Sequence, residues 1–237
     1  MEHSALVTGA AGRIGKAFAL ALAQMGYHIF LHYNTSRAKA EDTRKLIEET
    51  GQGCMLMQAN FTKEKEVSEL IKNCQKKGSI EVLVNNASRF VKSDITNEGA
   101  TLLDDLFRIN FKAPYILTKQ FARHCQKGLI INMLDTKINQ HQTEHLDYVL
   151  TKKSLEDFTY LSARQLGPDI RVNGIAPGLI LAPEGESETY LQKKSKDIPL
   201  QRSGTLEQLT NTLRFLINNA FVTGEVICVD GGEHLMK

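Results

Sequence analysis

The sequence predicts a doubly wound α/β domain, with seven parallel strands in one sheet and helices on both of its faces. Short β-rich runs alternate with longer helical patterns along the 237 residues, and this alternation requires crossover connections between parallel strands. The central runs Val82–Val84 and Leu129–Ile131 are continuously apolar, as strands covered on both faces are. We therefore expect three layers, α/β/α, in a Rossmann-like arrangement.

Each expected strand is a short β-rich run, followed by a turn or by a helical pattern. The strands are Ala5–Val7, His28–Tyr33, Met55–Ala59, Glu81–Val84, Leu129–Met133, Ile170–Val172 and Glu225–Val229. The clearest helices are Ile14–Met25, about Ser36–Thr50, Lys63–Lys77 with a solvated charged face, and Tyr148–Gln165. No linker or repeat divides the chain, so residues 1–237 are expected to form a single domain. Leu179–Leu200, rich in Glu, Ser and Lys, is expected to be a mobile, lid-like excursion.

Composition narrows the class of protein. The formal net charge of +2 gives no indication of a nucleic-acid partner. No run approaches the roughly 18 apolar residues of a membrane span, and the start at Met1 leaves no room for a secretory signal. The four cysteines form no C-x-x-C pair, which favours free thiols in a reducing compartment. We expect a cytoplasmic protein that acts on a small molecule, without a membrane or nucleic-acid partner.

A glycine-rich loop, Thr8–Gly15, follows the first strand and opens the first helix. A doubly wound fold places the pyrophosphate of a dinucleotide at this point, because small residues let the backbone approach and the helix N-terminus offers unpaired N–H groups. Arg13 within the loop can fold over cofactor phosphates. The second strand is followed by Asn34, Ser36 and Arg37, and no acidic residue there would repel a 2′-phosphate. The sequence therefore favours NADPH over NADH.

Tyr148 and Lys152 lie four residues apart near the start of a predicted helix, so their side chains share one helix face. The lysine charge is expected to lower the pKa of the tyrosine, which then donates a proton to the substrate. The spacing alone is common on solvated helices. It gains weight from its position after the fifth strand.

These motifs, in this order, resemble the short-chain dehydrogenase/reductase family. The loop is similar to the family's T-G-x-x-x-G-x-G, with Arg13 at the middle glycine, and Asn85–Ala87 is similar to its N-N-A-G. Asp230–Gly232 closes the last strand as in the family, and Asn110 matches the asparagine that holds a relay water. The resemblance implies a cofactor site made of Gly9, Arg13, Ile14, Gly15, Tyr33, Asn34, Ser36, Arg37, Asn60, Phe61, Asn86, Ala87, Ser88, Tyr148, Lys152, Pro177 and Gly178.

Departures from the family pattern indicate the substrate. Asp135 occupies the position, thirteen residues before Tyr148, where the family has serine, and the N-N-A-G glycine is replaced by Ser88, followed two residues later by Phe90. With Arg13, these residues resemble the pteridine reductase branch, which includes dihydromonapterin reductases. The resemblance implies that Phe90 stacks on a pterin, that Arg13 and Ser88 border it, and that Asp135 works with Tyr148.

The physical chemistry agrees with that branch. A serine hydroxyl can donate to a carbonyl oxygen as it gains negative charge, whereas an ionised Asp135 would repel that charge. Reduction of a C=N bond instead requires a proton on nitrogen, which a carboxyl–phenol pair can supply. The predicted catalytic residues are Asp135, Tyr148, Lys152 and Asn110. The sequence therefore predicts a pterin or folate reductase.

Alternatives stay open at this level. A carbonyl or 3-oxoacyl reductase would use the same fold, but in such an enzyme Asp135 would disfavour the reaction. A non-catalytic NADPH-binding regulator would keep the fold and the cofactor site without catalysing a reaction. His141–His145 fits H-x-x-E-H, but its polar flanks and the missing third ligand speak against zinc, so no metal is expected and His145 is a candidate for the substrate pocket. By analogy with the family, we expect a homotetramer.

Overall fold

Seven parallel strands form one sheet in the computed structural model, which describes residues 3–96, 99–140, 143–183, 185 and 188–236. The strands are β1 (Ser4–Val7), β2 (His28–Tyr33), β3 (Cys54–Gln58), β4 (Val82–Asn85), β5 (Gly128–Met133), β6 (Ile170–Pro177) and β7 (Val226–Val229). Their order across the sheet is β3-β2-β1-β4-β5-β6-β7, and every neighbouring pair is parallel. The predicted Rossmann-like α/β fold is confirmed.

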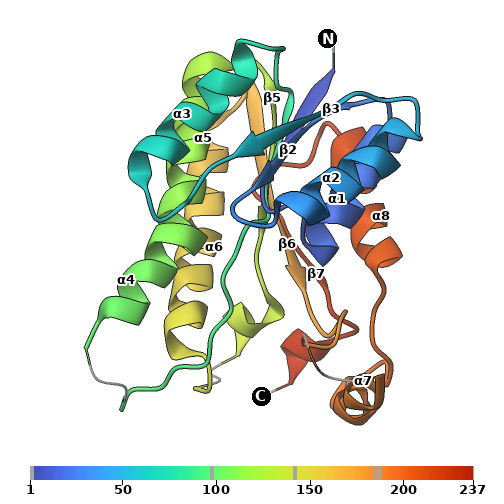
Figure 1. Cartoon of the computed structure of the whole chain (residues 1–237). Helices are drawn as coiled ribbons and strands as arrows, with labels where there is room; N and C mark the ends of the chain where they lie inside the picture. The colour runs from blue at the N-terminus through green and yellow to red at the C-terminus, as the bar shows by residue number, and fades with distance from the viewer. Residues whose placement is uncertain (1–2, 97–98, 141–142, 184, 186–187, 237) are drawn as a thin grey trace.

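Helices cover both faces of the sheet (Figure 1). One face packs against α1 (Arg13–Gln24), α2 (Arg37–Glu48) and α8 (Leu206–Asn218). The other packs against α3 (Glu64–Gln75), α5 (Ala113–His124) and α6 (Leu146–Leu166). The shorter elements are α4 (Thr101–Phe107), α7 (Glu188–Lys194), the π-helical turn η1 (Arg108–Lys112) and the 3₁₀ turns η2 (Thr136–Asn139), η3 (Ser195–Asp197) and η4 (Glu233–Leu235).

Successive side chains along each strand point to opposite faces of the sheet, so they pack alternately into one of two cores. Val7 and Val84 belong to the core under α1 and α8, while the preceding residues Leu6 and Leu83 belong to the core under α3 and α5. All four side chains are fully buried. Because helices cover both faces of the sheet, side chains on either face of a central strand are buried, which explains the continuously apolar runs of the sequence.

Two boundaries differ from the sequence prediction in a way that matters for the site. β6 continues from Val172 to Pro177, because the backbone of Gly174 to Pro177 pairs with β7 even though glycine and proline disfavour strands. The segment Leu179–Leu200, expected as an excursion, contains α7 and η3 in its described part, and both of its ends are attached to the rest of the fold. Leu179 accepts a backbone hydrogen bond from Gly204, and Leu200 donates one to Gly231. Residues 184, 186 and 187 lie outside the described residues.

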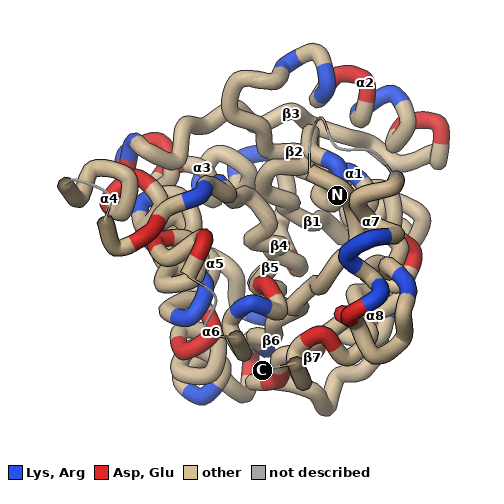
Figure 2. Tube along the Cα trace, turned by 90° about the horizontal axis from the view of Figure 1, so that it is seen from below, with Lys and Arg blue, Asp and Glu red and all other residues tan. Residues whose placement is uncertain are grey.

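The strand order reverses between β1 and β4, and ligands of open α/β sheets bind at the carboxyl ends of the strands at such a point. Figure 2 looks along the strands and shows basic and acidic residues interspersed over the outer helices. All four cysteines are free thiols, as predicted. In the described ranges, none of the helices combines the length and apolar character needed to cross a bilayer.

Candidate active site

A pocket of about 670 Å³ opens at the carboxyl edge of the sheet. Most of the predicted site residues line it: Gly9, Arg13, Ile14, Gly15, Asn34, Asn60, Phe61, Asn86, Ala87, Ser88, Phe90, Asp135, Tyr148, Lys152, Pro177 and Gly178. Four predicted residues, Tyr33, Ser36, Arg37 and Asn110, do not line it. The pocket therefore brings the glycine loop, the Tyr148–Lys152 helix and the Asp135 strand end together.

The glycine loop is built so that the backbone faces the pocket without side chains. Gly9 has φ +64°, and a Cβ there would lie 2.9 Å from Cα of Ala87. A Cβ on Gly15 would collide with the carbonyl oxygen of Gly9 and lie 2.5 Å from Nδ2 of Asn86. Gly12 is the N-cap of α1, and no side-chain hydrogen bond caps this end, so the first N–H groups of the helix face an approaching anion.

Arg13 reaches across the mouth of the pocket. Its Nη1 donates to the carbonyl oxygen of Ala182 at 2.5 Å, so the guanidinium connects the glycine loop to the segment after β6. A guanidinium has five N–H donors, and one such bond leaves the others for ligand oxygens. Arg13 therefore lines the pocket with donors that remain available to a ligand.

Tyr148 and Asp135 form the central pair of the pocket. The Tyr148 hydroxyl donates to Oδ2 of Asp135 at 2.9 Å, and Tyr148 is buried. Oδ1 of Asp135 accepts from the backbone N–H of Lys137 at 2.9 Å, which fixes the orientation of the carboxylate at the start of η2. The pairing follows from the fold, because β5 ends at Met133 and α6 returns along the same side of the sheet.

The predicted lowering of the tyrosine pKa by lysine is wrong. Burial raises the pKa of Tyr148 well above its ordinary value, and the charge and hydrogen bond of Asp135 raise it further. Nζ of Lys152 lies 5.6 Å from the centroid of the tyrosine ring and donates to the carbonyl oxygen of Met133 at 2.7 Å. Burial lowers the pKa of Lys152 to about 8, while the charge of Asp135 opposes that shift. Burial is thus the main cause of both shifts, and the carboxylate adds to the first and opposes the second.

Asn110 lies behind the pocket wall, in the helical stretch where the sequence places it. It is buried in the π-helical turn η1, and its amide is fully engaged. Its Oδ1 accepts from the Ser88 hydroxyl at 3.2 Å and from the Arg89 backbone at 2.8 Å, and its Nδ2 donates to the Arg89 carbonyl and to Thr151. All four hydrogen-bonding sites of the side-chain amide are therefore in use, and they hold the segment that carries Ser88 and Phe90.

Phe90 lies at the pocket wall rather than in the interior. It is 51% exposed, and its ring meets that of Tyr148 edge to face, with centroids 4.7 Å apart. His145, which is buried, supports the other side at a centroid distance of 4.0 Å, and one of its ring nitrogens bonds the Val91 carbonyl. Ser93 joins this segment to the start of α6, since its Oγ accepts from the backbone of Asp147. The arrangement leaves aromatic surface open to a flat ligand.

His145 belongs to the H-x-x-E-H stretch, of which His141 and Gln142 lie outside the described residues. Its packing under Phe90 shows that it supports the pocket wall without lining the pocket. Sequence patterns could not assign this contact, because it joins residues 55 positions apart.

The far end of the pocket departs in part from expectation. Tyr33 is buried in the core, while Ser36 and Arg37 begin α2 and are exposed, two and three residues beyond Asn34. Asn60, which lines the pocket as predicted, accepts through its side-chain oxygen from the backbone and the hydroxyl of Thr62, at 3.0 and 2.9 Å, and caps the turn that starts there.

His32 is a pocket residue that the sequence analysis missed as a site residue. It lies in β2, 2% exposed, and its ring stacks on Phe61 at a centroid distance of 4.2 Å. Burial lowers its pKa to about 4, so the imidazole is neutral at physiological pH. A histidine between Leu31 and Tyr33, at the carboxyl end of a mostly apolar strand, is the signal that could have singled it out.

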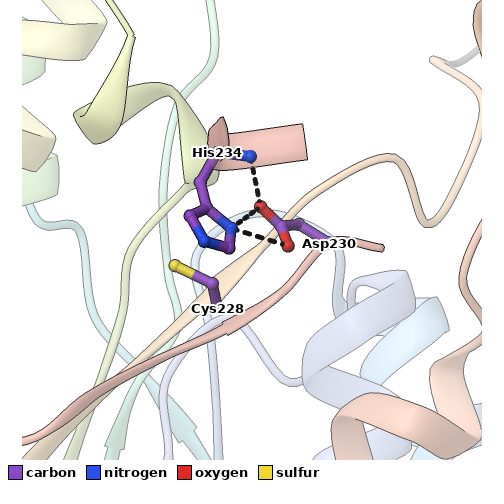
Figure 3. Close-up of side chains that lie close together, drawn as sticks. All are labelled: Cys228, Asp230 and His234. Carbon is purple, nitrogen blue, oxygen red and sulfur yellow. Dashed lines mark hydrogen bonds and ion pairs between the residues drawn. The ribbon is translucent and has the colours of Figure 1, made fainter. Parts of the chain in front are cut away.

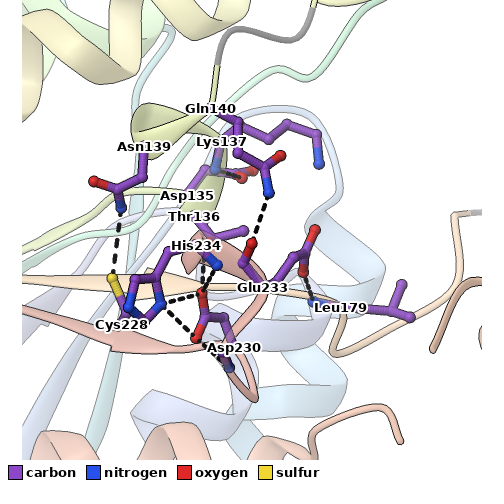
Figure 4. A network of polar contacts seen from close by, with 11 residues as sticks. Asp135, Thr136, Lys137, Asn139, Gln140, Leu179, Cys228, Asp230, Glu233 and His234 are labelled. Atoms are coloured by element: carbon purple, nitrogen blue, oxygen red, sulfur yellow. Dashed lines mark hydrogen bonds and ion pairs between the residues drawn. The ribbon is translucent and has the colours of Figure 1, made fainter. Parts of the chain in front are cut away.

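The C-terminal turn supports the Asp135 loop from behind (Figure 4). Thr136, which follows Asp135, donates its hydroxyl to Oδ2 of Asp230 at 2.5 Å. At the other end of η2, Nε2 of Gln140 donates to the carbonyl oxygen of Glu233 at 2.9 Å. The Glu233 carboxylate accepts from the backbone of Leu179, directly after the Pro177–Gly178 pair. One turn therefore holds two walls of the pocket.

Cys228, Asp230 and His234 gather beneath this turn (Figure 3), with potential ligand atoms within 4.8 Å of one another. The carboxylate of Asp230 already accepts from the Thr136 hydroxyl, from the backbone of Gly232 and His234, and from the His234 ring. Burial, and next the charge of Asp230, raise the pKa of the Cys228 thiol to about 11. The oxygens of Asp230 are already occupied by hydrogen bonds and the Cys228 thiol stays protonated, whereas a metal ion needs free lone pairs and a thiolate. We therefore interpret the cluster as a structural hydrogen-bond network.

Comparison with known proteins places this site in a family. Residues 9–234 match the family model described as enoyl-(acyl carrier protein) reductase. The chain is 34% identical to the 3-oxoacyl-[acyl-carrier-protein] reductase FabG of Staphylococcus epidermidis, over 99% of this chain and 100% of that protein. It is 31% identical to pteridine reductase 1 of Leishmania tarentolae, over 98% and 96% of the two chains.

A solved structure is similarly close. The fold superposes with a TM-score of 0.93 on the FolM alternative dihydrofolate reductase 1 of Brucella suis, determined in complex with NADP, at 34% identity over 99% of this chain and 96% of that one. The family model, these relatives and the Tyr148–Lys152 pocket agree. The chain belongs to the short-chain dehydrogenase/reductase family of oxidoreductases.

Proposed function

We propose that this enzyme is an NADPH-dependent pteridine reductase, which reduces a C=N bond in a dihydropterin or dihydrofolate ring. The observation that carries the proposal is the hydrogen bond of 2.9 Å between Tyr148 and Asp135, beside the open face of Phe90. A carboxyl–phenol pair suits protonation of a ring nitrogen, and an exposed aromatic wall suits a flat bicyclic substrate, with about 1 kcal/mol available from ring stacking.

The pocket fits a dinucleotide. Gly9 and Gly15 keep the loop free of side chains where any Cβ would collide with neighbouring backbone, and the uncapped start of α1 favours a pyrophosphate. Asn34 and the exposed Ser36 and Arg37 offer hydrogen-bond donors and a positive charge for a 2′-phosphate. When bound, the reduced nicotinamide supplies the hydride. The structural relative from Brucella suis contains NADP, which supports the choice of cofactor.

The proton comes from the Tyr148–Asp135 pair in this proposal. The raised pKa keeps the phenol protonated at neutral pH, so its hydroxyl is a donor rather than an acceptor. A proton that the Tyr148 hydroxyl gives to the ring nitrogen is replaced from solvent. Lys152, buried beside the ring of Tyr148, offsets the negative charge left on the pair. Arg13 and Ser88 border the substrate, and Phe90 covers its ring.

A 3-oxoacyl or general carbonyl reductase is the second candidate, because FabG of Staphylococcus epidermidis is 34% identical over almost the whole chain. The two candidates differ in what they require of residue 135. An ionised carboxylate repels the negative charge that develops on a carbonyl oxygen, whereas a serine hydroxyl stabilises it. Asp135→Ser therefore separates them.

The experiment follows NADPH oxidation at 340 nm with dihydrobiopterin, dihydromonapterin, dihydrofolate, a ketone panel and a 3-oxoacyl thioester. For Asp135→Ser we expect pterin kcat/KM to fall about 100-fold or more, while the Kd for NADP stays within about twofold, since the change removes proton donation. Turnover of a ketone or thioester but of no pterin, or higher ketone turnover in Asp135→Ser, would overturn the proposal. Tight NADPH binding without any turnover would indicate a regulator.

Cytoplasmic location and a homotetramer are part of the same proposal. The tetramer is an expectation from the family, and light scattering on the purified chain tests it directly. A mass of one or two protomers at micromolar concentration would contradict it.

A further inference from the structure

His32 makes contacts on both sides of its strand at the place where the sheet ends. The backbone N–H of Gly9 donates to its Nδ1 at 3.1 Å. Because Nδ1 accepts there, the ring proton is on Nε2, which donates to the carbonyl oxygen of Ala59 at 3.0 Å. One neutral ring thus joins the glycine loop after β1 to the segment after β3.

The two hydrogen bonds of His32 lie where the strands end and the pocket begins. β2 lies between β1 and β3, and the backbone ladder between β2 and β3 ends at Tyr33 and Gln58. Beyond these strand ends, one backbone hydrogen bond on each side still attaches the segments to β2, from the Ala10 N–H to the His32 carbonyl oxygen at 2.9 Å and from the Ala59 N–H to the Tyr33 carbonyl oxygen at 3.2 Å. The His32 ring adds a direct side-chain connection between the two segments. Gly9, Ala59 and Phe61 all line the pocket, so the spacing between them sets the width of this part of the cleft.

Packing keeps the ring in place. His32 is 2% exposed and stacks face to face on Phe61, with an interplanar angle of 7°. A buried imidazole with both nitrogens bonded and one face covered has a single orientation and a single tautomer. Gly9, with φ +64°, has no side chain of its own that could fix its orientation.

We propose that His32 is a positioning residue of the dinucleotide site, which fixes the glycine loop at Gly9 relative to the Ala59–Phe61 wall. The proposal does not depend on the pterin assignment, because it concerns cofactor binding alone. It acts through the loop backbone, so replacing His32 lowers affinity for the phosphate and adenosine part of the cofactor. The chemistry at Tyr148 is left unchanged.

The test measures the Kd of NADP and of 2′,5′-ADP, which lacks the nicotinamide half, by titration calorimetry at pH 7.5. His32→Leu removes both hydrogen bonds, and we expect both ligands to bind about tenfold more weakly, the size of effect of one to two buried hydrogen bonds. His32→Asn keeps an acceptor at the place of Nδ1 but loses the contact with Ala59, and we expect it to recover about half of the loss on a logarithmic scale. With saturating NADPH, kcat should stay within about twofold.

His28→Leu is the matched control. His28 lies in the same strand, outside the pocket lining, and its Nε2 has no hydrogen-bond partner. We expect its Kd values to stay within about twofold of the wild type. Binding by His32→Leu within twofold of the wild type overturns the proposal, and so does a loss confined to NADP. If His32→Leu fails to fold, His32→Asn alone decides, because unchanged 2′,5′-ADP binding there contradicts a role for the Ala59 contact.

Discussion

At the scale of single residues, the chemistry that we propose rests on three side chains whose acid–base properties depend on burial and on one another's charge. Asp135, Tyr148 and Lys152 share one pocket wall, and the pKa of the phenol and that of the ammonium move in opposite directions. Burial is the largest cause in both cases, because it penalises whichever form is charged. Asp135 adds to the first shift and opposes the second. A carboxylate in place of serine therefore changes the acid–base character of the whole group.

His32 gives the residue-scale prediction on pH. Its folded pKa of about 4 lies below the ordinary 6.5, so the folded state favours the neutral ring. The stability that this neutral ring contributes is fully present above pH 6.5 and is lost as the pH falls towards 4. About 2.5 pKa units correspond to roughly 3 kcal/mol of free energy of unfolding.

The measurement is urea unfolding of the wild type and of His32→Asn at several pH values between 7.5 and 4. We expect the wild type to lose roughly 3 kcal/mol more than the variant over this range, because the variant has no imidazole to protonate. Parallel curves for the two proteins would show that His32 is not buried neutral in solution.

At the scale of elements, the short turn η2 depends on the C-terminal turn. Thr136 and Gln140, at the two ends of η2, donate to Asp230 and to the Glu233 backbone. Asp230 is held below its ordinary pKa although burial acts to raise it, because hydrogen bonds from Thr136, His234 and Gly232 stabilise the charged form. The orientation of Asp135 thus rests on residues almost a hundred positions away.

Asp230→Asn tests this dependence. The amide has the shape of the carboxylate but offers two N–H groups to neighbours that are themselves donors, so we expect a loss of roughly 1–3 kcal/mol in free energy of unfolding. We also expect a several-fold lower kcat for the pterin with an unchanged Kd for NADP. Urea unfolding and steady-state kinetics give both numbers.

His234→Asn is the control for this prediction, because Asp230 then keeps its bonds from Thr136 and Gly232. Its effect should be smaller than that of Asp230→Asn in both assays. If Asp230→Asn keeps the stability and turnover of the wild type, the C-terminal turn does not support the orientation of Asp135.

At the scale of the whole molecule, one sheet separates two cores. Leu83 lies in β4 at the centre of the sheet and is fully buried under α3 and α5. We expect Leu83→Ala to lower the free energy of unfolding by roughly 2–5 kcal/mol, through lost burial and the cavity that remains. Leu161→Ala, on the exposed side of α6, should stay within about 0.5 kcal/mol. Equal effects of the two changes in urea unfolding would contradict the two-core description.

The sequence by itself determined the layered α/β fold, the glycine loop and the order of Tyr148, Lys152 and Asp135, because hydrophobic period, turn residues and motif spacing are local signals. It also placed most of the pocket lining correctly, since parallel strands end at one edge. Only the tertiary structure decided the direction of the Tyr148 pKa, the engaged amide of Asn110 and the bridge at His32. Burial and hydrogen-bond partners are properties of segments that meet in space, and the spacing of residues along the chain does not contain them.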